Sequence, residues 1–126
     1  QIKMAEETGL PLFLHARNTG SDFLNLMKEH RHRFTRGLVH CFTGTVEELQ
    51  GLIELNLHVS VNGCSMKTEE NLSVVRSIPL DALLFETDGP WCDIKNNHAS
   101  NKHLSPLSGT PLKSWKTVRE GCDGQE

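Results

Sequence analysis

The chain has 126 residues, of which 37% are hydrophobic and 23% charged, and its formal net charge is −3. This length suits one ordinary domain, and the composition is typical of globular rather than disordered chains. The acidic balance excludes a bulk basic surface for nucleic acid, although a bound metal ion can reverse the sign locally. No apolar stretch approaches the roughly 20 residues of a membrane span, and no signal-peptide pattern opens the chain. We therefore expect no membrane association, and nothing in the sequence predicts a protein partner.

The first element is a helix that is already ending near the start of the chain. Residues 2–8 have helical composition and stop at Gly9, a typical residue after a helix C-terminus. Because the chain begins at Gln1 without an initiator Met, we expect it to be a fragment.

Strand and helix patterns then alternate along the chain. Short apolar or β-branched runs predict four strands, at 10–15, 37–40, 57–63 and 83–88. Strands alternating with helices of this length predict βαβ units and a parallel sheet. The runs are nearly continuous in their apolar character, so we expect strands that are buried on both faces.

Three helices are predicted between these strands. The first covers about 21–34, with Thr19 or Ser21 as its N-cap. The second starts at Thr45, which has capping-box spacing with Glu48. The third starts at Thr68 and stops before a proline at position 79.

After Asp93 the sequence becomes polar and rich in Ser, Pro, Gly and Asn, without a sustained helical or strand period. We interpret 93–126 as loop or tail, with a short amphipathic turn around Trp115 and Val118 as an alternative. The predicted domain covers residues 1–98, and 99–126 form a weakly ordered polar tail.

Polar residues stand where the predicted strands give way to loops: His15, His40, Asn62 and Asp88. The carboxyl ends of parallel strands lie on one edge of a sheet, so these side chains can meet in space. Imidazole nitrogens and carboxylate oxygens suit divalent ions such as Zn, Mn or Mg, which activate water at neutral pH. We therefore predict a metal site built from His15, His40 and Asp88.

Glu86 and Asp88 share a face of the last strand, because side chains alternate along a strand. One carboxylate is expected on the metal and the other in support of it. The alternative is a solvated strand end with Asp88 and Gly89 as a turn, since turn-prone acids after strands are common.

Two cations near strand ends are candidates for contact with a phosphate. Arg17 follows His15 by two residues, and Lys67 follows the third predicted strand. For both, the alternative is a solvated surface side chain.

Other conspicuous residues are interpreted as structural. His30 and His32 do not face each other on a helix, so the HRH stretch is a solvated basic helix end. Trp91 is expected to pack. The remaining candidates are His98 and His103, to which no specific role is assigned, and the strand-end cysteines Cys41, Cys64 and Cys92.

The four cysteines form no CxxC pair, which predicts reduced thiols and an intracellular protein of the cytoplasm, the nucleus or both. Those at strand ends could be thiolate ligands, but buried inert thiols are expected.

Four stretches in order resemble consecutive motifs of the TatD-type deoxyribonucleases, which are metal-dependent hydrolases. They are LPLFLHARN, GLVHCFTGT, VSVNGCSMKTEENL and LLFETDGPW, within about residues 1–98. The resemblance is greatest to the eukaryotic branch of the family, chiefly through NGCSMKTEENL and ETDGPWC.

The resemblance implies a (β/α)₈ TIM barrel, of which this chain supplies about strands four to seven, with up to two divalent metal ions (Mg, Mn or Zn). It also implies hydrolysis of DNA phosphodiester bonds through metal-activated water. By motif match, His15, His40 and Asp88 occupy ligand positions, and Asp88 also orients the attacking water. Glu86 matches the acidic residue that accompanies Asp88, and Arg17 a position that faces substrate phosphate.

The chain departs from the family pattern in ways that leave other functions open. The HxH motif expected after the first strand of the family barrel is absent, as is the glutamate after the third. A catalytically inactive truncated isoform that acts by binding is therefore an alternative. Hydrolysis of a small amide or ester, as in related amidohydrolases, is another, although no lysine stands at a predicted strand end.

Overall fold

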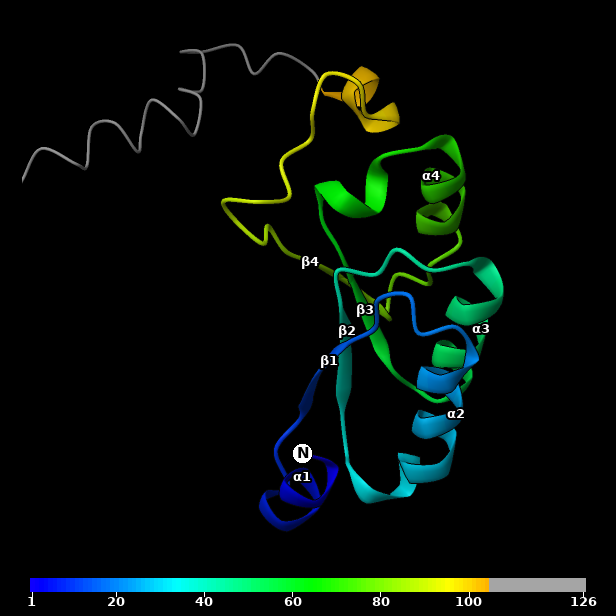
Figure 1. Cartoon of the computed structure of the whole chain (residues 1–126), viewed down its shortest axis with the longest axis vertical. Helices are drawn as coiled ribbons and strands as arrows, with labels where there is room; N and C mark the ends of the chain where they lie inside the picture. Colours follow the sequence, from blue (N-terminus) through cyan, green and yellow to red (C-terminus); the bar gives the residue numbers. More distant parts are fainter. Residues whose placement is uncertain (105–126) are drawn as a thin grey trace, which may run out of the picture.

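The structure, a computed structural model, describes residues 1–104 (Figure 1). Helices and strands alternate along the chain in the order α1 (Ile2–Thr8), β1 (Leu12–His15), α2 (Ser21–His30), η1 (Arg31–Arg33), β2 (Gly37–His40), α3 (Val46–Glu54), β3 (His58–Val61), η2 (Gly63–Met66), α4 (Glu69–Arg76), β4 (Leu83–Phe85) and η3 (Ala99–His103). The α/β class and the order of the predicted elements are confirmed, while each predicted strand except β2 is shorter than expected.

The four strands form one parallel sheet in the order β1-β2-β3-β4, so neighbours in sequence are neighbours in space. Figure 1 shows α2, α3 and α4 on the same side of this sheet, while no helix of residues 1–104 lies over its other face. A doubly wound sheet would reverse its strand order and carry helices on both faces. Sequential strands with all crossover helices on one face are the arrangement of a (β/α) barrel wall.

Two of the helix starts are capped as the sequence predicts. The Thr45 side chain accepts from the Glu48 backbone N–H, and the Glu48 carboxylate accepts from the Thr45 N–H. Thr68 caps α4 through a reciprocal pair of bonds with Asn71. The predicted Thr19 or Ser21 cap is wrong, because Gly20 is the N-cap of α2 and makes no side-chain bond.

The basic stretch after α2 is not a purely solvated helix end, which corrects the sequence interpretation. Arg31 donates hydrogen bonds to the carbonyls of Leu55 and Phe34, and its guanidinium lies 4.9 Å from the Phe34 ring centroid. Arg33 pairs with Glu6 at 2.7 Å and so ties η1 to α1. These contacts fasten the chain at the amino-terminal edge of the sheet.

The core lies between the sheet and its helices. Val39, Val59 and Val61 of the two central strands are fully buried. They belong to one cluster with apolar side chains from the helices and loops: Ala5, Met27, Phe34, Phe42, Leu49, Leu52, Leu57 and Ile78. This side of the sheet therefore holds the central strands in place under the loops that carry the polar strand ends.

The opposite face of the sheet corrects the expectation of strands buried on both faces. Alternation places Phe13, Leu38, His58 and Leu84 there, and they line a shallow, mostly apolar hollow. Phe85, at the edge on the helix-covered side, is still 81% exposed. The central strands β2 and β3 are the more buried ones, but Leu38 and His58 on their open face are only half-buried.

This exposed apolar surface predicts that the 126-residue chain self-associates. Each Å² of apolar surface removed from water contributes roughly 25 cal/mol, and the edge strands β1 and β4 present unpaired backbone groups. We expect dimers or larger species in size-exclusion chromatography, and a shift toward monomer in Leu84→Lys/Phe85→Lys. Leu80→Lys is the matched control, because Leu80 is 89% exposed but lies outside the sheet. A sharp monomer peak for the unchanged chain at all concentrations would contradict this prediction.

The segment from Asp93 to Leu104 is more ordered than the sequence suggests. The Ala99 N–H donates to the Lys67 carbonyl, and Lys102 pairs with Glu69 of α4. His98, to which no role was assigned, is buried, and its Nδ1 has no hydrogen-bond partner among the described residues. The alternative turn around Trp115 and Val118 lies outside the described residues. No helix in residues 1–104 has both the length and the apolar character that crossing a bilayer requires.

Candidate active site

The carboxyl ends of the strands meet at one edge of the sheet. His15 ends β1 and His40 ends β2, and the two are register partners in the parallel pair. Their ring centroids lie 5.0 Å apart, and the Phe13 ring lies 4.8 Å from that of His40. His15 is exposed, whereas His40 is half-buried.

Glu86 joins the ends of three strands. Its Oε1 accepts hydrogen bonds from the Cys41 backbone N–H at 2.9 Å and from the Asn62 side-chain amide at 3.0 Å. Its Oε2 pairs with His40 Nδ1. The carboxylate therefore has donors on both oxygens, and it fixes the loops after β2 and β3 relative to β4.

The contact with Glu86 determines which ring nitrogen of His40 is available to bind a metal ion. A carboxylate only accepts hydrogen bonds, so in the neutral imidazole Nδ1 carries the proton and Nε2 keeps its lone pair. Nε2 lies 3.7 Å from Oδ1 of Asp88, which is beyond hydrogen-bond reach. Two acceptors thus face each other, and a cation between them would satisfy both. The donor set fits a divalent ion, with Glu86 orienting the histidine from behind as a supporting carboxylate does in metal sites.

The backbone is strained on both sides of this pair. Cys41 and Asp88 both have φ of 50°, in the left-handed region that non-glycine residues seldom adopt. Such conformations cost of order 1–3 kcal/mol and persist only where the surroundings impose them, most often at functional sites.

The remaining predicted site residues lie around this pair rather than within it. Arg17 is exposed in the loop after β1, and Lys67 is exposed at the end of η2. Among residues 1–104, His15, His40 and Asp88 are not a group of three ligand atoms close enough to hold one metal ion as they stand. The structure brings His40, Glu86 and Asp88 together, with His15 at the side of the His40 ring.

The sequence did not predict a functional role for two residues of the site. Asn62 is buried and donates to Glu86, and the Ser60 hydroxyl accepts from the Cys41 N–H at 3.2 Å. The signal was available for Asn62, which stands at the end of the third strand as the histidines stand at theirs. Trp91, which was expected to pack, is instead 77% exposed beside the Asp88 turn.

Three cysteines flank the carboxylates. Cys41 and Cys92 are buried, as predicted, and Cys64 is half-buried. The Cys92 thiol lies 3.5 Å from Asp88 Oδ2. Burial, with smaller contributions from the neighbouring Cys64 and Asp88, raises the pKa of the Cys92 thiol above its ordinary range.

Gly63 allows the loop after β4 to lie against the end of β3. A Cβ at this position would stand 2.0 Å from the Cys92 carbonyl oxygen, which is backbone and cannot rotate away. A side chain at residue 63 would therefore displace the segment that follows Asp88.

We accordingly expect Gly63→Ala to destabilise the chain by about 1–3 kcal/mol and to expose Cys92. The measurement is the urea midpoint at fixed chain concentration, together with the alkylation rate of Cys92 by mass spectrometry. Gly89→Ala is the control, because a Cβ there meets only the Thr87 hydroxyl at 3.6 Å. Equal rates of Cys92 alkylation in the two variants would show that the position of the segment after Asp88 does not depend on a glycine at residue 63.

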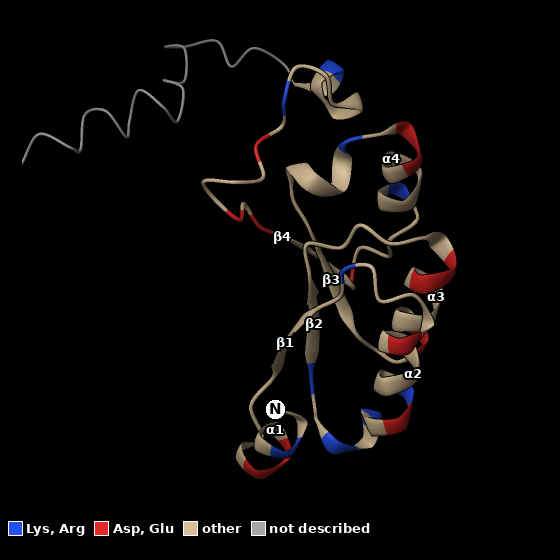
Figure 2. Cartoon of the chain, in the orientation of Figure 1, with Lys and Arg blue, Asp and Glu red and all other residues tan. Residues whose placement is uncertain are grey.

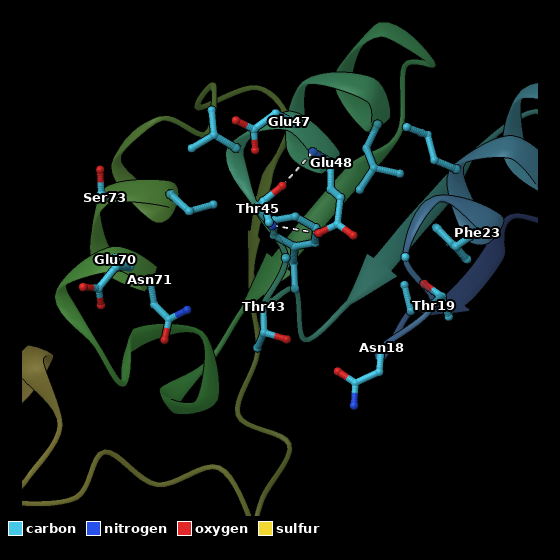
Figure 3. A pocket seen from close by; sticks show the side chains of 18 residues that line it. Asn18, Thr19, Phe23, Thr43, Thr45, Glu47, Glu48, Glu70, Asn71 and Ser73 are labelled. Carbon is cyan, nitrogen blue, oxygen red and sulfur yellow. Dashed lines mark hydrogen bonds between the residues drawn. The ribbon is translucent and has the colours of Figure 1, made fainter.

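A cavity larger than the hollow on the open face lies elsewhere, on the helix-covered side. It has a volume of about 610 Å³ and lies among the loops after β1 and β2 and the start of α4 (Figure 3). Its ionisable lining residues are Glu47, Glu48 and Glu70, and Glu48 is engaged in the α3 cap. An acidic lining without a cation does not suit a phosphate, so this cavity is not the candidate site.

The charge distribution supports the need for a cation at the carboxyl edge. Figure 2 shows acidic residues along α3, α4 and the segment after β4, and basic residues gathered toward the end of α2. The basic residues of the last turn of α2 and of η1 lie at the amino-terminal edge of the sheet. Arg17 and Lys67 lie exposed near the carboxyl edge, but a phosphate placed directly at Glu86 and Asp88 would be repelled unless a metal ion reversed the charge there.

Comparison with known proteins identifies the family. The profile described as "TatD related DNase" matches residues 1–115. "Deoxyribonuclease Tat-D" of Schizosaccharomyces pombe is 46% identical over 125 residues, which are 97% of this chain and 39% of the relative. "3'-5' ssDNA/RNA exonuclease TatD" of a Rahnella species is 37% identical over 94 residues, or 72% of this chain and 36% of the relative. The chain thus spans about two fifths of the length of these curated relatives.

Solved structures agree on the fold. A hydrolase TatD family protein from Entamoeba histolytica superposes with a TM-score of 0.77 and 36% identity, over 83% of this chain and 35% of that one. A protein from Saccharomyces cerevisiae described as an uncharacterized amidohydrolase gives a TM-score of 0.67 and 34% identity, over 93% and 36% of the two chains. The four-stranded sheet with its one-sided helices is part of a TIM barrel, as the sequence predicts, and the chain belongs to the TatD-related DNase family of metal-dependent hydrolases.

Proposed function

We propose that this chain contributes the metal-binding edge of a nuclease that hydrolyses phosphodiester bonds of DNA. The observation that carries the proposal is the pairing of His40 Nε2 with Asp88 Oδ1, two acceptors 3.7 Å apart with Glu86 fixing the histidine. The names of the relatives supply the substrate class, and the acidic charge of the edge supplies the reason for a cation.

The proposed roles rest on the motif match to the family and on the place of these residues at the strand ends. His15, His40 and Asp88 would hold a divalent ion of the Mg, Mn or Zn class, which supplies Lewis-acid charge for the phosphoryl oxygens and eases deprotonation of water. Asp88 would also orient the attacking water and take its proton on a carboxylate oxygen. Arg17 and Lys67, both exposed near the strand ends, would contact substrate phosphates.

Two other functions receive less support. An amidohydrolase with a carboxylated lysine needs a lysine at a strand end, and β1 to β4 end at His15, His40, Val61 and Phe85. An inactive isoform that acts only by binding remains the rival, and the experiment below separates the two. Three cysteines among residues 1–104 are free thiols, which supports an intracellular location.

A chimera tests the proposal without requiring this chain to supply the rest of a barrel. The chain replaces the segment of the S. pombe relative that it matches, and cleavage of DNA is assayed with and without divalent ions. We expect cleavage that EDTA abolishes and Mn²⁺ or Mg²⁺ restores. A folded chimera that fails to cleave, while the unaltered relative cleaves under the same conditions, would favour the inactive isoform. Cleavage that survives EDTA would remove the metal from the mechanism.

A further inference from the structure

Cys41, Cys64 and Cys92 form a thiol cluster beside the candidate active site. Cys41 directly follows β2, Cys64 lies in η2 after β3, and Cys92 lies in the loop after β4. Their three sulfur atoms lie within 4.8 Å of one another. Among residues 1–104 this is the group of three ligand atoms that is close enough to hold one ion.

The contacts within the cluster show sulfur turned toward sulfur. Cys64 Sγ lies 2.7 Å from Cys92 Sγ, and the Cys41 thiol lies 3.4 Å from the side-chain oxygen of Asn62. Thiols are weak hydrogen-bond donors and acceptors, so these contacts alone do little to hold three of them together. Their convergence from three separate loops is better explained by a common ligand.

The geometry suits a tetrahedral thiolate site. With a metal–sulfur distance of about 2.3 Å, two ligands of one ion lie about 3.8 Å apart. The present separations, from 2.7 Å to at most 4.8 Å, span that value. Cys64 is half-buried, so it has room to move away from Cys92, and its exposure gives an ion access from solvent.

We propose that Cys41, Cys64 and Cys92 form a second metal site, selective for thiophilic divalent ions of the Zn²⁺ and Cd²⁺ class. Binding replaces three S–H protons with three sulfur–metal bonds and releases three protons. A divalent ion leaves the three-thiolate complex with a charge of −1, whereas a monovalent ion would leave −2 beside Glu86 and Asp88. The divalent class is therefore favoured. This site is distinct from the one proposed for hydrolysis, whose imidazole and carboxylate ligands suit harder ions.

The test is a Cd²⁺ titration of the reduced chain, followed by thiolate-to-metal charge-transfer absorption in the ultraviolet. All proteins carry Cys122→Ser, because Cys122 lies outside the described residues and would add a fourth thiol. We expect one Cd²⁺ per chain. Each of Cys41→Ser, Cys64→Ser and Cys92→Ser should weaken binding at least about tenfold. His32→Ala is the matched control, because this imidazole is exposed in η1 at the amino-terminal edge of the sheet, and it should leave the absorption unchanged.

A second measurement does not depend on whether the serine variants fold. Cd²⁺ should protect all three cysteines together from iodoacetamide, as read by mass spectrometry, and protection should disappear in urea at the same Cd²⁺ concentration. Protection of Cys64 alone would overturn the site. Equal Cd²⁺ binding by the unfolded chain would also overturn it. So would a reduced chain that binds no Cd²⁺ and in air forms a Cys64–Cys92 disulfide. None of these outcomes bears on DNA cleavage, so the thiolate site and the nuclease proposal can fail independently.

Discussion

Asp88→Asn in the chimera should lower metal-dependent DNA cleavage at least about a hundredfold. The substitution keeps the size of the side chain but removes the charge that faces His40 Nε2 across 3.7 Å. It also removes the carboxylate that is proposed to take the proton of the attacking water. Initial cleavage rates at saturating Mn²⁺ measure the effect.

The control for this substitution is Asp93→Asn, an exposed carboxylate in the same loop. This control should leave the DNA-cleavage rate within about twofold of that of the unsubstituted chimera, as is usual for a surface change away from the site. If Asp88→Asn retains most of the activity while the chimera remains sensitive to EDTA, another residue holds the metal and Asp88 only forms the turn.

Glu86→Gln should weaken metal binding by about 10–100-fold without removing any proposed ligand. A glutamine can keep one oxygen for the Cys41 and Asn62 donors, but then its NH₂ group faces His40 Nδ1. Nδ1 must then become the acceptor, so the proton moves to Nε2 and blocks the lone pair that would bind the ion. The free energy of unfolding should also fall by about 1–3 kcal/mol, read from a lower urea midpoint, because the hydrogen bonds from Cys41 and Asn62 would go to a neutral amide oxygen and lose their charge assistance.

Two readouts separate this positioning role from a merely structural one. Metal affinity comes from a calorimetric titration of the chain, and stability comes from the urea midpoint at fixed concentration. Glu54→Gln, an exposed change at the end of α3, is the matched control for both. A variant that loses stability but keeps its metal affinity would show that Glu86 fastens the strands and does not orient His40.

The sequence was sufficient to predict that the strand-end residues lie at one edge of the sheet, because this follows directly from the parallel topology. A parallel sheet brings all strand carboxyl ends to one edge, so residues at the ends of separate apolar runs are predicted to lie near one another. The caps at Thr45 and Thr68 were equally local, since the side chains and the backbone groups that they bond lie within three residues.

What the sequence missed depends on contacts between loops. The pairing of Glu86 with the Cys41 N–H and Asn62 requires the exact offset of three loops, which no periodicity encodes. The sulfur contact between Cys64 and Cys92 has the same origin, with Gly63 allowing the loops to meet. Burial of the edge strands was overestimated because an apolar run shows that a strand prefers burial, not that a neighbour covers it.

The most direct test of the proposed metal centre is Mn²⁺ binding by the chain itself, followed by electron paramagnetic resonance of the free ion. Mn²⁺ favours oxygen and imidazole ligands over thiolates, so the thiol cluster contributes little to the signal. We predict weak binding by the unchanged chain and an affinity at least about tenfold lower in His15→Ala/His40→Ala. Equal Mn²⁺ affinity in the two proteins would contradict the assignment of these histidines to a metal centre at the carboxyl edge of the sheet.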